Sequence, residues 1–188
     1  MSEDDLQPSG DVCPSADAIQ DFWALASRYA GVSNVDAYLG TPWGKAVAPE
    51  AWSFAGSPGE ASRLLGLVLD RHKTAISTLR AEYDEADEPL PHVGDLSIVL
   101  DGVGVPGALI RTADVVVAPF GKITAAQAAA EGEGDGTLET WRTDRRESWL
   151  GTRRPVDDDT LVVWERFTVV YPRSPADAPG PLPIVGAR

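Results

Sequence analysis

The sequence predicts an α+β fold in which helices flank a central group of strands. One observation is the segment 57–60, Ser-Pro-Gly-Glu, which combines a capping-box pattern with proline at the first helical position. Apolar residues then recur with helical spacing at Ala61, Leu64, Leu65 and Val68. A second observation is the run 161–171, which is rich in β-branched and aromatic residues and therefore predicts a long central strand.

Shorter signals predict the other elements between residues 15 and 149. In chain order we expect a helix capped by Ser15 or Asp17 and ending at Gly31, strands at 97–100, 108–112 and 115–118, a helix from Thr124 to Glu131, and a helix capped by Thr137 after the acidic loop 131–136.

Composition restricts the possible functions. The chain has 188 residues and a net charge of −13, which argues against broad, nonspecific binding of long nucleic acids. No apolar run approaches the roughly 20 residues that cross a bilayer. The acidic segment 1–5 lacks the apolar core of a secretory signal, and the only cysteine, Cys13, forms no intrachain disulfide. We therefore expect a cytoplasmic protein that does not bind membranes.

The glycine pattern at 102–107 matches the spacing of a dinucleotide-binding loop, but its context does not fit. Such a loop opens a helix whose N-terminus faces the phosphates. Here the glycines lead into Ala108-Leu109-Ile110, which predicts a strand, and Asp101-Gly102 is a hairpin-turn signal. We therefore expect a turn here and no cofactor.

Lys73 is the strongest single candidate for chemistry. It follows the helix predicted after residue 57 and precedes the hydroxyl-bearing residues Thr74, Ser77 and Thr78. A lysine partly removed from water has a lowered pKa and can act as a base, or can activate a neighbouring hydroxyl. The alternative is a surface lysine that is favoured by the helix dipole.

The acidic loop is a second candidate. Glu131, Glu133 and Asp135 alternate with glycines, so carboxylates gather where the backbone can approach a ligand closely. Such carboxylates can act as a general acid or base, hold Mg²⁺ or Mn²⁺, or remain a solvated surface loop. With two histidines, one cysteine and no zinc-type spacing, we expect no zinc site and predict no bound metal.

Five arginines lie between residues 142 and 154. They predict either a local basic cleft or a solvated helix face. Arg142 could anchor a phosphate while Trp141 stacks on a base, or Trp141 could lie in the core with the arginine paired to an acid.

These motifs together resemble the ASCH family, small barrels related to the RNA-binding PUA domains. The resemblance runs from Trp52 to Tyr171 and rests on the Lys-Thr segment 71–75, the turn 91–95, the acidic loop, the Trp-Arg pair at 141–142, and the strand from Glu165. It implies a small, mostly antiparallel β-barrel over 51–173. Helices surround this barrel. An acidic, disordered start and a helical extension at 1–50 precede it, and a proline-rich tail follows at 174–188.

The resemblance also implies a catalytic set. Some family members remove the acetyl group from acetylcytidine, using a lysine, a threonine three residues later and a glutamate; others are RNA-binding proteins or ribonucleases. The lysine corresponds to Lys73 and the glutamate to Glu133, with Glu131 as the alternative. Ile76 replaces the threonine, and Arg145 replaces a histidine.

We therefore predict Lys73, Glu133 and Thr74 as catalytic residues. We expect the substrate to be bound by Arg142, Glu131, Ser77, Thr78, Arg145 and Trp141. The expected partner is single-stranded RNA, a nucleoside or a nucleotide, bound by a monomer or a homodimer. The expected function is a metal-independent hydrolase or, alternatively, a non-catalytic binding module. We further expect Lys73 to be an exposed cleft residue that contributes little to stability.

Overall fold

The computed structural model describes residues 14–31, 47–54, 57–150 and 155–174. The helices are α1 (Ala16–Ala26), η1 (Ser27–Tyr29), α3 (Pro58–Leu69), α4 (Arg80–Ala86), η2 (Phe120–Lys122), α5 (Ala125–Ala130) and α6 (Leu138–Trp149). The strands are β1 (Ala51–Ser53), β2 (Ala75–Leu79), β3 (Leu96–Leu100), β4 (Pro106–Pro119) and β5 (Leu161–Tyr171). Apart from Ser174, the predicted tail lies outside the described residues, as does most of 1–14. The predicted domain boundaries stay predictions.

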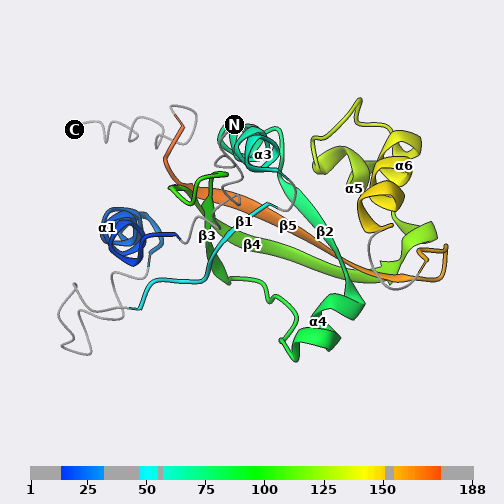
Figure 1. The fold of residues 1–188 in the computed structure, drawn as a ribbon, viewed down its shortest axis with the longest axis horizontal. Coiled ribbons are helices and arrows are strands. Elements are labelled where there is room, and N and C mark those ends of the chain that lie inside the picture. The colour runs from blue at the N-terminus through cyan, green and yellow to red at the C-terminus, as the bar shows by residue number, and fades with distance from the viewer. Residues whose placement is uncertain (1–13, 32–46, 55–56, 151–154, 175–188) are drawn as a thin grey trace, which may run out of the picture.

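The strands form one sheet in the order β1–β3–β4–β5–β2. β1 runs parallel to β3, and the other three pairings are antiparallel. The sheet curls into a half-barrel with helices packed around it (Figure 1). The predicted α+β class, the mostly antiparallel barrel type and the N-terminal helix are thus confirmed.

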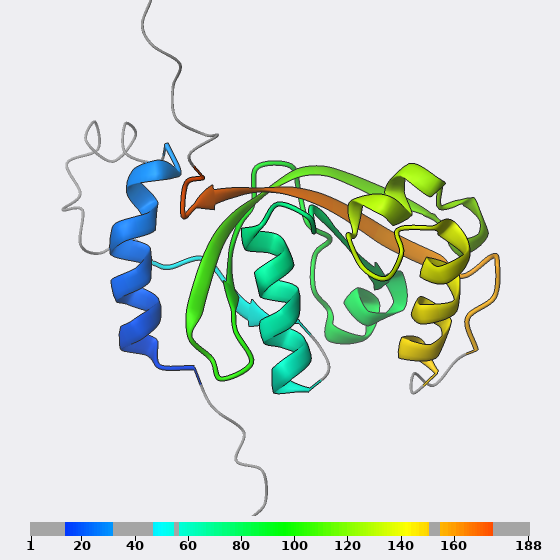
Figure 2. The ribbon, with the colours of Figure 1, turned by 90° about the horizontal axis from the view of Figure 1, so that it is seen from above.

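The helices cover both faces of this sheet. The apolar stripe of α3 packs in the same cluster as Val99 and Phe167. The adjacent strand residue Ile98 points to the opposite face and packs against α1. α5 and α6 cover Trp164 on that face, at the end of the sheet far from α1 (Figure 2).

Several helix starts follow the predicted capping chemistry. The hydroxyl of Ser15 accepts a bond from the backbone of Ala18, and the hydroxyl of Ser57 accepts one from Glu60. Thr124 and Thr137 cap α5 and α6 in the same way. In the part of the chain that the structure describes, no helix combines the length and apolar character needed to cross a membrane.

Other elements differ from the sequence prediction. Residues 108–112 and 115–118 belong to one strand, β4, because a register shift between Thr112 and Asp114 accommodates the polar interruption. The segment after Lys73, which was expected only as a hydroxyl-rich stretch, is strand β2. The predicted hairpin turn is confirmed, since the carboxylate of Asp101 accepts bonds from Val103 and Val105 in the β3–β4 connection.

Candidate functional site

Lys73 lies on the connection between α3 and the edge strand β2. After α3 the chain reverses through Arg71, whose φ is +62°. The backbone amides of His72 and Lys73 then both donate to the carbonyl oxygen of Leu67, at 2.9 and 3.0 Å. This turn directs the lysine side chain inward, where it is only 1% exposed. The expectation that Lys73 is an exposed residue is therefore wrong.

The loop between α5 and α6 is fastened to this connection. The amide and the hydroxyl of Thr74 both donate to the carbonyl oxygen of Ala130, at 2.8 and 3.1 Å. Gly132 has a φ of +65° and lies directly against the backbone of His72 and Lys73. Only glycine, which has no side chain, permits this close approach of the two backbones. The contact brings Glu131 and Glu133, on either side of Gly132, next to Lys73.

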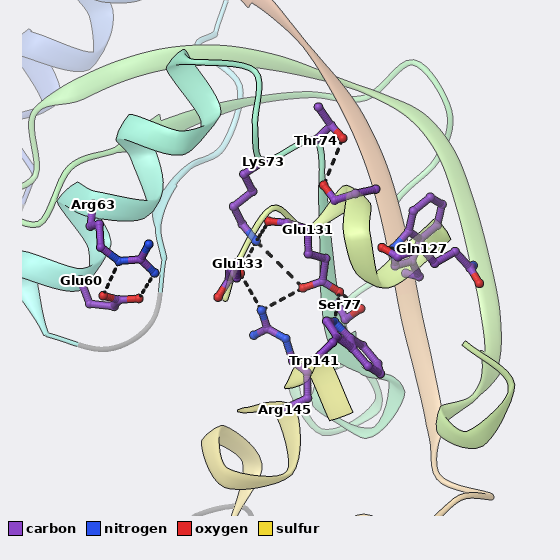
Figure 3. Close-up of polar contacts among 12 residues, drawn as sticks. Glu60, Arg63, Lys73, Thr74, Ser77, Gln127, Glu131, Glu133, Trp141 and Arg145 are labelled. Carbon is purple, nitrogen blue, oxygen red and sulfur yellow. Dashed lines mark hydrogen bonds and ion pairs between the residues drawn. The ribbon is translucent and has the colours of Figure 1, made fainter. Parts of the chain in front are cut away.

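The side chains meet in a four-membered ion cluster, shown in Figure 3. The ammonium of Lys73 donates to Oε1 of Glu133 and, at 3.3 Å, to the carbonyl oxygen of Glu131. Nη2 of Arg145 lies 2.8 Å from Oε2 of Glu131 and 2.6 Å from Oε1 of Glu133. We call Lys73, Glu131, Glu133 and Arg145 the ion cluster. Its two cations balance its two carboxylates.

Glu131 is the structural centre of the ion cluster. Its side chain is fully buried, and its Oε1 accepts bonds from Ser77 Oγ at 2.5 Å and from Trp141 Nε1 at 2.8 Å. A buried carboxylate is stable only when its oxygens are paired in this way. Ser77 and Trp141 therefore hold Glu131, and Glu131 in turn holds Arg145.

Glu133 and Arg145 are the members of the ion cluster that are partly open to solvent. Their side chains are 19% and 15% exposed, whereas those of Lys73 and Glu131 are closed off. Burial raises the pKa of Glu133, but the charges of Lys73 and Arg145 outweigh it and hold the pKa below its ordinary value. Burial lowers the pKa of Lys73, and the adjacent carboxylates oppose that effect. The arrangement keeps a partly exposed carboxylate ionised beside a guanidinium.

The structure brings together six of the nine residues predicted for the site. These are Lys73, Ser77, Glu131, Glu133, Trp141 and Arg145. Thr74 lies next to them but uses its hydroxyl to anchor Ala130. Trp141 is 5% exposed and stacks on Phe120 with ring centroids 5.2 Å apart, so it is a core residue.

Thr78 and Arg142 point elsewhere. Thr78 follows Ser77 on β2 and therefore faces the other side of the sheet. Nη2 of Arg142 donates to the carbonyl oxygen of Gly121 at 3.1 Å, which gives it a structural contact in η2, just after β4. Arg146 pairs with Asp158 at 3.0 Å. The arginine segment, as far as the structure describes it, is thus used mainly for contacts within the protein.

The face of β2 that carries Thr78 borders a cavity of about 610 Å³. Glu165, which lies opposite Ile76 in the β2–β5 register, lines this cavity and accepts a bond from Thr112 Oγ1 at 2.6 Å. The sequence reasoning did not select Glu165 as a site residue. The signal that could have found it was the charged pair Glu165-Arg166 in the middle of a strand that is otherwise mostly apolar.

The acidic loop does not gather three carboxylates. Oδ1 of Asp135 accepts bonds from the amide and the hydroxyl of Thr137, at 2.9 and 2.8 Å, at the start of α6. Among the residues that the structure describes, no three His, Cys, Asp or Glu side chains are grouped so that they could hold a metal ion.

Comparisons with known proteins complete the assignment. Protein EF3133 from Enterococcus faecalis V583 is 28% identical, with a TM-score of 0.65 and a match over 82% of this chain and 89% of that one. An ASCH domain from Lactobacillus crispatus JV V101 shares the fold, with 24% identity, a TM-score of 0.63 and coverage of 80% and 94%. A comparison with curated proteins gave no match. A family model described as the ASCH domain matches residues 50–171, well over half of the chain. The chain therefore belongs to the ASCH domain family, whose fold is PUA-like.

Proposed function

We propose that this protein is a metal-independent amidohydrolase that removes an acyl group from the amine of a nucleoside, with Glu133 as its catalytic base. The observation that carries the proposal is the placement of the Glu133 carboxylate. It is partly exposed, is bonded to the buried ammonium of Lys73, and lies 2.6 Å from Nη2 of Arg145. The resemblance to family members that deacetylate acetylcytidine supports this choice of reaction.

In the proposed reaction, the exposed edge of Glu133 accepts a proton from a water molecule as the water attacks the acyl carbon. The carbonyl bond becomes a tetrahedral oxyanion, and the guanidinium of Arg145 stabilises its negative charge. The protonated Glu133 then donates that proton to the leaving nitrogen as the carbon–nitrogen bond breaks. The products are the carboxylic acid and the free amine, so atoms and charge balance.

Lys73 acts in this scheme as a positioning residue. Because its side chain is 1% exposed, Lys73 does not contact the substrate and affects the reaction only through Glu133. Its charge keeps Glu133 ionised and fixes the direction of the carboxylate. This role differs from the sequence expectation, in which the lysine itself was the reacting group.

A nucleoside fits the protein's charge better than a long RNA does. The net charge is −13, and the described arginines of α6 are bonded to Glu131, Glu133, Asp158 and Gly121. Strong binding of a polyanion depends on several cations that are free to contact phosphates. The ribonuclease alternative therefore has less support than the nucleoside alternative.

A second candidate is a nucleoside-binding module without turnover. Ile76 favours it, because this side chain carries no hydroxyl and lines the cavity on the face of β2 opposite Ser77. The hydroxyl of the family's lysine-threonine-glutamate set is thus missing at position 76. The next side chain on the same face of β2, Thr78, carries a hydroxyl, whereas that of Ser77 lies on the other face and is bonded to Glu131.

Acetylcytidine and a short single-stranded RNA, incubated separately with the purified protein, test the proposal. We expect acetylcytidine to release acetate and cytidine, and the RNA to remain intact. Chromatography measures both outcomes. Shortened RNA without acetate release would identify a ribonuclease instead. Binding of acetylcytidine with neither product would establish the binding module.

A further inference from the structure

The cavity of about 610 Å³ lies apart from the ion cluster, across the strand β2. Ala75, Ser77 and Leu79 face the side of α5 and α6, whereas Ile76 and Thr78 line the cavity. Residues from β1, α4, β3, β4 and β5 and from the segment 88–92 complete the wall. A volume of this size lies within the range of about 300–1,000 Å³ that is typical of small-molecule sites.

The charged residues that line the cavity are mostly acidic. Four carboxylic acids line the cavity, Glu50, Glu88, Asp95 and Glu165, and no lysine or arginine is among its described lining residues. Among the lining residues that the structure describes, His92 is the only one with a basic side chain. The ion cluster, in contrast, balances two carboxylates with two cations. The cavity therefore favours a ligand that brings positive charge and disfavours phosphates and carboxylates.

The acidic residues share the cavity with an apolar and aromatic wall. Trp52 and Tyr83 lie among the lining residues, together with Ile76, Leu90 and Leu96. Hydroxyls of Thr78, Ser97 and Thr112 add hydrogen-bonding groups. A few fixed polar groups within apolar walls are typical of a site for an organic molecule, whereas a hydrated inorganic ion needs no such wall.

Glu165 is the most buried of the four acidic residues that line the cavity, since Glu50, Glu88 and Asp95 are exposed. It is half-buried in the middle of β5, and Thr112 Oγ1 donates to its Oε1 at 2.6 Å. Its register partner on β2 is Ile76, so an apolar side chain rather than a cation lies opposite the carboxylate. A half-buried carboxylate with a single hydroxyl donor is incompletely compensated, and a ligand ammonium would supply the missing charge.

We propose that this cavity binds a small organic amine as its cation, with the ammonium at Glu165 and an aromatic or apolar body against Trp52 and Tyr83. The site does not depend on the hydrolase proposed above, because none of its lining residues belongs to the ion cluster. Tryptamine matches this class, since it joins a primary amine to a flat indole. Indole-3-propionate has a similar body with the opposite charge.

Calorimetric titration of the full chain with tryptamine and with indole-3-propionate tests the site. We expect saturable one-to-one binding of tryptamine and none of indole-3-propionate. Glu165→Gln keeps an oxygen for Thr112 but removes the charge, so it should weaken tryptamine binding by about tenfold or more. Glu85→Gln removes an equal charge from α4 at a residue outside the cavity lining and should bind tryptamine like the wild type.

Glu88→Gln provides a second variant at an exposed position, with little risk to folding, and should weaken binding by about two- to fivefold. Unchanged affinity in both cavity variants would overturn the proposal, as would equal binding of the two indoles or no binding of tryptamine by the wild type. Binding of a lysine-containing peptide without binding of tryptamine would also overturn it, in favour of a protein-docking surface.

Discussion

Gly132 packs so closely against His72 that a β-carbon at the glycine would lie 2.3 Å from the carbonyl oxygen of the histidine. The contact joins the acidic loop to the connection that carries Lys73. Glu131 and Glu133 flank this glycine, so the backbone contact sets the position of both carboxylates relative to the ammonium.

Replacing Gly132 with alanine should therefore disturb the ion cluster as well as the backbone. The φ of +65° alone costs an alanine about 1–2 kcal/mol, and the clash with the His72 carbonyl adds to that loss. Gly136→Ala is the matched control, because Gly136 has a φ of +74° but no atom within 4 Å of its β-carbon position. Urea unfolding should show a larger loss for Gly132→Ala; equal losses would contradict the close contact.

Lys73→Met should destabilise the protein strongly. The substitution retains an apolar chain of similar length but leaves Glu131 and Glu133 without their buried cation, which typically costs about 3–5 kcal/mol. Lys122→Met, at an exposed lysine after β4, should change the free energy of unfolding by less than about 0.5 kcal/mol. The two losses can be compared by urea unfolding. A small effect at Lys73 would mean that the ammonium is solvated.

Local sequence signals predicted the elements whose ends carry caps or turns. α3 begins at Pro58 after Ser57, and β5 covers 161–171 as expected. α4 was missed because its N-cap, Leu79, has no capping side chain and its sequence is largely polar. The sequence predicted two strands in place of β4 because polar residues lie between the two apolar runs. In the structure a change of register at that point keeps β4 continuous.

Local sequence signals also predicted only part of the candidate site. Lys73, Glu131 and Glu133 lie in recognisable motifs, but their burial depends on the turn at Arg71 and on the α5–α6 loop, which are tertiary features. The direction of Arg142 could not be read from the sequence, because a neighbour of Trp141 on a helix points about 100° away from it.

The stability of the protein should depend on pH through Glu133. Its pKa in the folded protein lies below the ordinary value of 4.5, so its stabilising contribution is present above about pH 4.5 and is lost as pH falls through the lowered pKa. The difference in unfolding free energy between wild type and Glu133→Gln should therefore shrink on acidification. Urea unfolding between about pH 3 and 6 measures it, and a difference that is independent of pH would exclude a lowered pKa.

Glu165 should show the opposite shift. Burial raises its pKa above 4.5, Asp95 raises it further, and the bond from Thr112 partly opposes both effects. Thr112→Val removes the donor at nearly constant volume, so the pKa of Glu165 should rise further in this variant. NMR titration of the Glu165 side-chain carboxyl carbon measures this pKa in the wild type and in Thr112→Val. A pKa that falls in Thr112→Val would show that the hydroxyl does not stabilise the carboxylate.

The most direct test of the central claim is the initial rate of acetylcytidine hydrolysis by Glu133→Gln. Loss of the base should reduce kcat by about a hundredfold or more, while circular dichroism confirms that the variant is folded. Glu147→Gln, an exposed residue on α6 two positions beyond Arg145, removes the same charge and should retain the wild-type rate. A wild-type rate in Glu133→Gln would contradict the assignment of Glu133 as the catalytic base.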